Sequence, residues 1–362
     1  MEQKKRAKFV NRERTQFLKT LKQRVDNYFI ENKLDKHANG NMIFKSIIVL
    51  SAYFIPVLAI YIFHLPSYLL ILGFILAGFG AAGVGMSVMH DANHGAYSEN
   101  KWVNLILGGT LNLIGGFDVN WRLQHNILHH TYTNITHIDE DIDQRLKMRW
   151  SPFFKYHPVQ KYQHIYAFFA YCLATLSWVV MKDYKQFYTY SQNGVNKSNK
   201  LKLAYDLAKM LAFKIFYYIY MLIIPIYILG YSAGIYLAGF FLMHAITGFV
   251  LSTVFQLAHV VEGAEFPMPN EKGEIENEWA IHQVETTANF ATRNKLISWL
   301  VGGLNFQIEH HLFPKISHVH YPAISKIIKK TCEEYGVKYI EFRKMRHAIV
   351  SHTTHLKNMG RA

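Results

Sequence analysis

The chain has 362 residues, 51% of them hydrophobic, and a formal net charge of +14 with histidine counted as neutral. Its two cysteines, Cys172 and Cys332, exclude a disulfide framework and a cysteine-ligated iron–sulfur cluster. The basic residues lie mainly in the two tails and the connecting loops, which favours an oriented membrane protein over a nucleic-acid-binding groove.

The first segment, from Met1 to about Lys45, is polar and basic, with Lys4, Lys5 and Arg6 at its start. It has no early apolar run, so we expect no cleaved signal peptide. The segment predicts an amphipathic helix that either lies on an anionic membrane surface or is solvated. We interpret residues 1–45 as a basic N-terminal cytoplasmic segment.

Two apolar blocks follow, Ser46–Phe63 and Pro66–Met89, and each is about long enough to cross a bilayer. Only two residues separate them, so they predict a tight hairpin. The second block is rich in glycine and alanine, which permits close packing between helices. His90 follows directly, so the second helix is expected to continue just beyond the hydrocarbon.

Two shorter apolar runs lie farther along the chain. Trp102–Phe117 is glycine-rich and is interpreted as interfacial or re-entrant, whereas Tyr166–Met181 is ambiguous by length. Leu211–Leu229 and Ala233–Ala258 then predict a second hairpin, with Lys214 close enough to the start of its span to reach out of the membrane. No further span follows, and residues 331–362 are interpreted as a basic C-terminal tail.

Three histidine-rich blocks lie outside these spans: His90–His94 (H-D-A-N-H), Gln124–His130 (Q-H-N-I-L-H-H) and Asn305–Pro314 (N-F-Q-I-E-H-H-L-F-P). The two histidines of the first block are four residues apart, so they share one helix face. In the third block, His310 and His311 are about 100° apart on a helix, so each could serve a different metal.

The three blocks can share one metal site only if all of them lie on one side of the membrane. One hairpin before His90 and another between His130 and His310 meet this condition, provided that Trp102–Phe117 and Tyr166–Met181 do not span. Both hairpin turns lack Lys and Arg, while the tails are rich in them. The histidine blocks and both tails are therefore expected to face the cytoplasm.

The candidate metal ligands gather at the ends of the predicted spans. They are His90, His94, His125, His129, His130, His259, Gln307, His310 and His311. One tetrahedral zinc needs fewer ligands, and the set suits two metals with about four or five ligands each. Imidazole suits Fe, Zn, Cu and Ni, so ligand type leaves the metal open. The Glu-x-x-His pairs of soluble di-iron bundles are absent, and doubled histidines at span ends do not suit a pair of haems.

The remaining histidines near the blocks are interpreted as surface or hydrogen-bonding residues. They are His137, His157, His164, His282, His318 and His320. His244 lies inside a predicted span and is expected to pack or to form a hydrogen bond there.

The three blocks resemble the histidine boxes of membrane fatty acid desaturases, and the resemblance covers about residues 45–330. Gln307 in place of a first histidine is the form seen in the front-end group, which includes linoleoyl-CoA desaturases. The resemblance implies an all-α integral membrane fold, with four transmembrane helices in two hairpins capped by a cytoplasmic helical domain. It implies two iron ions held by the nine candidate ligands, and a desaturase domain over residues 46–330. Phe255–His259 (F-Q-L-A-H) resembles the segment that supplies an additional ligand.

The chain departs from eukaryotic front-end enzymes, which usually carry a fused cytochrome b5 domain with a His-Pro-Gly-Gly haem motif. No such motif occurs in this sequence. Electrons are therefore expected from a separate ferredoxin, cytochrome b5-like protein or flavoprotein reductase. A basic cytoplasmic surface would suit an acidic carrier.

By resemblance, the reaction uses O2 and external electrons to remove two hydrogens from neighbouring methylenes of a fatty acyl chain, leaving a cis double bond and water. An apolar tunnel would hold the chosen carbon pair beside the metals, so that geometry sets the position of the bond. Ligand imidazoles need their other N–H fixed by neighbouring groups. The sequence candidates for this role are Asp91, Asn93, Asn126, Asn305 and Glu309.

Other functions remain open from the sequence. The same boxes suit hydroxylation, acetylenation, or desaturation of a sphingoid substrate, and the substrate could be an acyl-CoA or a lipid-linked acyl chain. A membrane metal carrier is the alternative of another class. A carrier needs polar or histidine residues along its spans at the bilayer midplane, whereas these histidines cluster at span ends.

Overall fold

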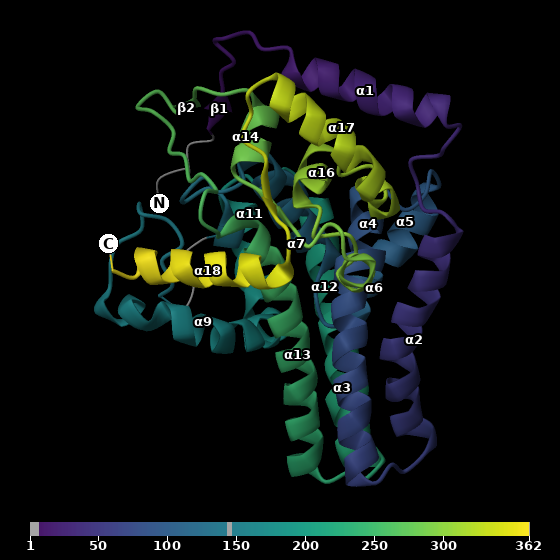
Figure 1. Ribbon diagram of the computed structural model, residues 1–362. Helices are drawn as coiled ribbons and strands as arrows, with labels where there is room; N and C mark the ends of the chain where they lie inside the picture. The colour runs from purple at the N-terminus through teal and green to yellow at the C-terminus, as the bar shows by residue number, and fades with distance from the viewer. Residues whose placement is uncertain (1–6, 143–146, 362) are drawn as a thin grey trace.

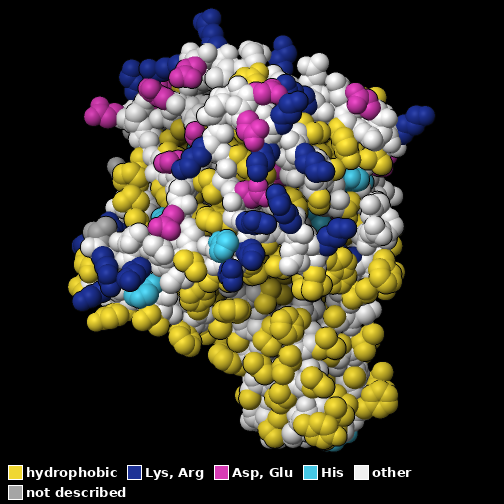
Figure 2. All heavy atoms as spheres, in the orientation of Figure 1, with side chains coloured by type: hydrophobic (Ala, Val, Ile, Leu, Met, Phe, Trp, Pro, Cys, Tyr) yellow, Lys and Arg dark blue, Asp and Glu magenta, His cyan; other side chains and the backbone are white. Residues whose placement is uncertain are grey.

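The computed structural model describes residues 7–142 and 147–361, so the basic residues Lys4, Lys5 and Arg6 lie outside the described residues. Helices dominate the fold, and Figure 1 shows a stem of long helices that carries a broader head. Figure 2 shows hydrophobic side chains covering the lower stem, while Lys, Arg, Asp and Glu gather on the head. This division of the surface is typical of a protein partly immersed in lipid.

Four helices are long and apolar enough to cross a membrane. The first is α2 (Gly40–Ile62), and the second is α3 (Ser67–Gly83), which continues through η1 (Val84–Val88) into α4 (Met89–His94). The third is α12 (Lys200–Tyr218), continued by η6 (Ile219–Ile228), and the fourth is α13 (Ala233–His259). The predicted helical fold with four apolar helices is therefore confirmed.

Small residues let the stem helices approach one another closely. A Cβ atom added at Gly80 of α3 would lie 2.5 Å from the backbone nitrogen of Tyr53 in α2. One added at Gly78 would lie 2.9 Å from the carbonyl oxygen of Met243 in α13. Glycine at these two positions therefore allows α3 to pack between α2 and α13.

Two pairs of shorter helices could each form a broken span or a re-entrant loop. One pair covers Lys101–Leu113 and Asp118–Tyr132, with a bend of 112°. It comprises α5 (Lys101–Gly108), α6 (Thr110–Leu113), α7 (Asp118–Arg122), η2 (Leu123–His129) and α8 (His130–Tyr132). The other covers Pro158–Cys172 and Ala174–Gln192, with a bend of 56°. It comprises η4 (Pro158–Tyr162), α9 (Gln163–Cys172), α10 (Ala174–Ser177), η5 (Trp178–Lys182) and α11 (Asp183–Gln192). The chain thus has up to six spans by length and composition.

Lys214 does not reach out of the membrane as expected from its place in α12. Its side chain is buried, and its Nζ donates to the carbonyl oxygen of Gly115 at 2.7 Å and to Asp183 Oδ2 at 2.7 Å. The ion pair offsets the cost of burying the ammonium group. It also fastens α12 to both bent helix pairs.

The head contains the remaining elements. They are α1 (Phe17–Glu31), η3 (Glu140–Ile142), α14 (Trp279–Glu285), α15 (Lys295–Leu300), α16 (Gln307–Leu312), η7 (His318–His320), α17 (Tyr321–Glu334) and α18 (Met345–Met359). Two short parallel pairings tie distant segments together: β1 (Lys8–Phe9) with β2 (Glu274–Ile275), and β3 (Ala288–Phe290) with β4 (Ile340–Phe342).

Helix α1 is amphipathic as predicted, but its apolar face is covered by protein. Phe17, Leu21, Val25 and Phe29 recur every four residues and are buried in a core with residues of α14, α16 and α17. The apolar face is therefore not free to lie on a membrane surface, because those helices cover it. The basic face, with Lys19 and Lys22, is exposed, as the solvated alternative predicts. The C-terminal segment is folded as well, and α18 lies beside α9 in Figure 1.

Candidate metal centre

The histidine blocks converge where the stem meets the head. His90 and His94 lie on α4, which continues the second stem helix, and His259 is the last residue of α13. The second block lies on η2 and α8, and the third on α16. Four separate parts of the chain therefore present imidazole rings to one region.

Four of the histidines form a first group. The ligand atoms of His90, His94, His125 and His310 all lie within 4.8 Å of one another, and all four residues are buried. His130 adjoins them, because its Nε2 lies 3.0 Å from His310 Nε2 and 3.3 Å from His125 Nε2. This arrangement could hold one metal ion.

A second group is formed by His129, His259 and His311, whose ligand atoms also lie within 4.8 Å of one another. The two groups are adjacent, because the His311 ring stacks on the His130 ring with centroids 4.4 Å apart. The adjacent histidines of the third block thus join different groups, as their angular separation on a helix allows.

The histidine side chains fit metal ions, because several of their buried ring nitrogens have no hydrogen-bond partner among the described residues. Within the described residues, the Nε2 atoms of His94, His129, His259 and His311 are buried without a hydrogen-bond partner. Each such unpaired buried group costs about 1–3 kcal/mol, which a metal–nitrogen bond would offset. Burial also lowers the pKa of His310 and His311 well below that of a free imidazole. Both rings are thereby kept neutral, which is the form that binds a metal.

The other ring nitrogen of several ligands is fixed by groups outside the boxes. His129 Nδ1 lies 2.9 Å from Asp139 Oδ2, and His311 Nδ1 lies 2.8 Å from Gln283 Oε1. His310 Nδ1 lies 3.2 Å from the Tyr321 hydroxyl oxygen. These contacts orient the rings so that Nε2 faces the centre of each group.

Sequence reasoning missed these orienting residues, because they lie 10–28 positions from the histidines they contact. Of its own candidates, only Asp91 is near a box imidazole, with Oδ1 3.9 Å from His90 Nδ1. Asn93, Asn126, Asn305 and Glu309 make their hydrogen bonds elsewhere. Glu309, for example, accepts from Asn289 and Tyr339 and so fastens α16 to β3 and to the Tyr339 side chain.

Gln307 lies three residues before His310 on α16 and stays a candidate ligand. Its side chain is buried, and its Oε1 has no hydrogen-bond partner among the described residues. It lines a cavity of about 940 Å³ that also touches His90 and His125. Gln307, His90 and His125 therefore share the wall of this cavity.

The cavity extends from the histidines into the stem. Its lining includes Ala81 of α3, Gly85 of η1, and Met243 and Thr247 of α13. The most distant of these on α13, Met243, is 16 residues before His259, a rise of about 24 Å along a helix. An elongated apolar molecule could therefore lie between the stem helices with part of its length beside the histidines.

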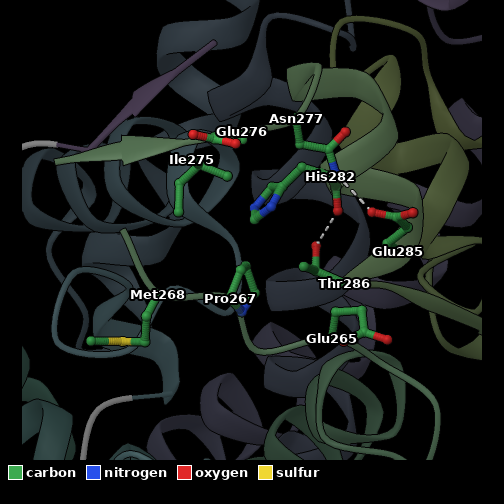
Figure 3. Close-up of a pocket in the computed structure, with 9 residues that line it drawn as sticks. All are labelled: Glu265, Pro267, Met268, Ile275, Glu276, Asn277, His282, Glu285 and Thr286. Carbon is green, nitrogen blue, oxygen red and sulfur yellow. Dashed lines mark hydrogen bonds between the residues drawn. The ribbon is translucent and has the colours of Figure 1, made fainter. Parts of the chain in front are cut away.

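His244 and His282 remain outside the metal groups, as expected. His244 also lines the stem cavity, and its Nε2 is 2.9 Å from the Tyr217 hydroxyl. His282 points into a separate cavity of about 330 Å³ in the head, between Ile275 and Pro267 (Figure 3). Its neighbour Gln283 contacts His311, so α14 links this cavity to the second metal group.

The family model and the relatives that match this chain are all described as desaturases. The model of a family described as fatty acid desaturase matches residues 65–343. The chain is 38% identical over 348 residues to an sn-1 linoleoyl-lipid 6-desaturase of Arthrospira platensis, covering 95% of this chain and 92% of that protein. It is 37% identical over 353 residues to a protein of the same description from Synechocystis, covering 96% of each. It is also 37% identical over 358 residues to an acyl-lipid (8-3)-desaturase of Physcomitrium patens, covering 97% of this chain and 73% of that protein.

Proposed function

The chain belongs to the fatty acid desaturase family, and on that premise we propose that it inserts a cis double bond near the carboxyl end of acyl chains esterified to membrane lipids. The protein is an oxidoreductase that introduces a double bond into fatty acyl chains. The names of the cyanobacterial relatives support a lipid-linked substrate and a front-end position. The observation that carries the proposal is the pair of buried histidine groups at the head end of an apolar cavity.

We propose that the metals are two iron ions. His90, His94, His125, His130 and His310 would hold one, and His129, His259 and His311 the other, with Gln307 beside the first. Bound iron would supply the redox chemistry that lets O2 remove hydrogen from an unactivated methylene. The balance is –CH2–CH2– plus O2, two electrons and two protons, giving –CH=CH– and two molecules of water.

The protein's own contribution is orientation and enclosure. Asp139, Gln283 and Tyr321 hold the ligand rings in place through their Nδ1 atoms. The walls of the stem cavity hold the acyl chain, so that one carbon pair lies beside the histidines. The buried setting of the histidines excludes bulk water, which limits competing oxidation.

We propose that the four long helices form two membrane hairpins and that both tails and the histidines face the cytoplasm. The catalytic domain is then residues 46–330, flanked by the segments 1–45 and 331–362. The turns after α2 and η6 contain no Lys or Arg, while the exposed basic residues gather on the head (Figure 2). Reporter fusions at the turn near Ser232 and at the C-terminus test this, and cytoplasmic signals from both would contradict it.

We propose that electrons come from a separate protein, a ferredoxin, a cytochrome b5-like protein or a flavoprotein reductase. The basic residues of the head would suit an acidic carrier. Activity with each purified carrier and its reductase identifies the donor.

The decisive experiment is expression in a host supplied with defined fatty acids, followed by gas chromatography–mass spectrometry of the products. We expect a new cis double bond on the carboxyl side of any bond already present. A hydroxylated product without a new double bond would refute the desaturation reaction. Absence of iron in the purified, active protein would refute the metal assignment.

A further inference from the structure

The lower edge of the head carries exposed Lys and Arg side chains from two adjoining segments. Strands β3 and β4 are parallel, with Phe290 opposite Phe342, so the chain leaves both strands at the same edge. Two basic segments, 293–295 and 343–346, follow there. We call their exposed Lys and Arg residues the basic rim, which consists of Arg293, Lys295, Arg343, Lys344 and Arg346.

Neighbouring carboxylates do not cancel the positive charge of the basic rim. Neither 291–300 nor 343–361 contains Asp or Glu. Among the described residues, no carboxylate forms an ion pair with any of the five rim residues. Glu341 attracts Arg293, but its carboxylate pairs with Lys329 Nζ at 2.8 Å. Glu262, whose N–H donates to Ser351 Oγ of α18, adds one negative charge against five positive ones.

Packing places α15 and α18 at the depth where the stem would leave the hydrocarbon of a bilayer. Ile297 of α15 and Ile349 of α18 pack against one core, which on α13 runs from Val250 to Leu257. This stretch lies 17–24 positions after Ala233, the first residue of α13, which is a rise of about 26–36 Å along the helix. A hydrocarbon layer is about 30 Å thick. A stem whose far end lies at one boundary therefore brings α15 and α18 to the other.

A second stem helix gives a similar depth for α15. Lys45 of α2 has its Nζ 5.5 Å from the centroid of the Trp299 ring of α15. Lys45 lies 17 positions before Ile62, the last residue of α2, which is a rise of about 26 Å. Tryptophan is enriched near this boundary, because its ring is apolar and its N–H is polar.

Apolar side chains accompany the rim cations on the surface. Leu296, Trp299 and Leu300 of α15 are 67%, 37% and 52% exposed, and Val350 of α18 is 63% exposed. Figure 2 shows Lys and Arg side chains along the lower edge of the head, directly above the hydrophobic surface of the stem. An acidic soluble protein would match only the cations, whereas a bilayer with anionic headgroups matches both kinds of side chain.

Building on the membrane placement in the proposed function, we propose that the basic rim and the apolar side chains of α15 bind anionic lipid headgroups at the membrane surface. The two leucines and Trp299 enter the outer part of the hydrocarbon, and the rim cations pair with headgroups that carry net negative charge. The Gly302–Gly303 turn joins α15 to the third histidine block, so the bound lipids hold the segment that leads into this block.

Native mass spectrometry of the purified full-length protein in detergent tests this by measuring lipid dissociation constants. The probes are palmitoyl-oleoyl phosphatidylglycerol and palmitoyl-oleoyl phosphatidylcholine, which share their acyl chains and differ in net charge. We expect the parent to bind the phosphatidylglycerol at least about tenfold more tightly, because each Lys or Arg at an anionic surface adds about fivefold. Arg343→Gln/Lys344→Gln/Arg346→Gln should reduce this ratio to about twofold or less. Its affinity for phosphatidylcholine should stay at the parent value, which also checks that the variant is folded.

Two control variants separate the position of the charge from its amount. Arg343→Lys/Lys344→Arg/Arg346→Lys keeps the charge of the rim and should keep the parent ratio. Lys19→Gln/Lys22→Gln/Lys326→Gln removes as much charge from exposed positions on α1 and α17 and should also keep it. An equal loss of the ratio in this last variant, or a parent that binds both lipids equally, would overturn the proposal.

An acidic electron carrier is the other class of partner that a basic surface suits. If the glutamine variant of the rim kept the lipid ratio while its KM for the carrier rose about tenfold, the rim would dock the carrier and the lipid proposal would fail. The lipid dissociation constants are measured without turnover, so the absence of a new double bond in the fed host would overturn the proposed function alone.

Discussion

At the scale of single residues, the proposed metal centre depends on imidazoles that are buried and oriented. Several of the candidate ligand rings use Nδ1 for orientation and offer Nε2 to the centre, as His129 does between Asp139 and its group. A histidine that lies outside the centre has its own contacts, such as His244 with Tyr217. Position in the fold, rather than residue type, therefore separates the two roles.

Removing one ligand from either group should abolish turnover. We expect His129→Ala and His310→Ala to give no desaturated product while the protein still inserts into membranes at the parent level. Product analysis and immunoblotting of membranes measure both. His64→Ala is the matched control, because His64 is exposed at the turn after α2 and stacks only on Tyr231 among the described rings. Retained turnover in either ligand variant would count against its assignment.

Removing an orienting charge should weaken metal binding without removing a ligand. For Asp139→Asn we expect iron affinity to fall about 10–100-fold, the usual effect of losing such a partner. Iron content after competition with a calibrated chelator measures this in the purified protein. Asp26→Asn is the control, because Asp26 pairs with Lys36 on the exposed side of α1. Unchanged affinity in Asp139→Asn would show that the contact is not needed for binding.

At the scale of elements, close backbone contacts and buried ion pairs fix the positions of the histidine blocks relative to one another. The Gly302–Gly303 turn precedes α16 and adopts positive φ values of 64° and 69°. A Cβ added at Gly302 would lie 2.2 Å from the carbonyl oxygen of Met86, in the helix that leads to His90. The turn thus sets the third block directly against the first.

Gly302→Ala should therefore lower the free energy of unfolding by more than the backbone strain alone would. Gly336→Ala supplies the control, because Gly336 has φ 67° but open space where the Cβ would lie. Strain at such a φ costs about 1–3 kcal/mol, so we expect both variants to lose stability. Only Gly302→Ala should also lose iron. Equal melting temperatures and iron contents for the two variants would show that the contact with Met86 is unimportant.

The buried ion pair of Lys214 and Asp183 joins α12 to α11. Lys214→Met should destabilise the protein by about 3–5 kcal/mol, because the Asp183 carboxylate would stay buried without its cation. We expect Lys214→Met/Asp183→Leu to recover much of this loss. Unfolding in detergent measures the three proteins, and a double variant as unstable as the single one would contradict the explanation.

At the scale of the whole molecule, the stem and head are each incomplete without the other. The stem helices end in His90, His94 and His259, and the head supplies His310 and His311 on a helix braced by α14 and α17. The cavity that meets these histidines is walled by both bent helix pairs and by the stem. A bound metal therefore joins segments that lie more than 200 residues apart in the chain.

Metal removal should lower the stability of the entire fold. A metal present at about 100 times its dissociation constant contributes about 2.7 kcal/mol, so chelation should lower the melting temperature by several degrees. Thermal unfolding before and after chelation measures the shift. The His129→Ala/His310→Ala double variant should show little further change. An equal shift in that variant would mean that the chelator acts elsewhere.

The sequence by itself determined the helical class, the four apolar helices and the histidine blocks. Helix length, apolar runs and residues four apart are local properties that a linear pattern records. His259 was found in the same way, from a short segment at the end of a predicted span. The adjacent histidines of the third block also suggested two groups, because their angular separation is fixed by the helix itself.

Only the tertiary structure decided which groups orient the ligands, where Lys214 lies and what covers α1. Asp139, Gln283 and Tyr321 carry no signal of their own, because they meet the histidines only after several segments have packed together. Lys214 looked able to reach solvent until Asp183 was placed beside it. A side chain's partners depend on distances in space, and chain position constrains these only within a few residues.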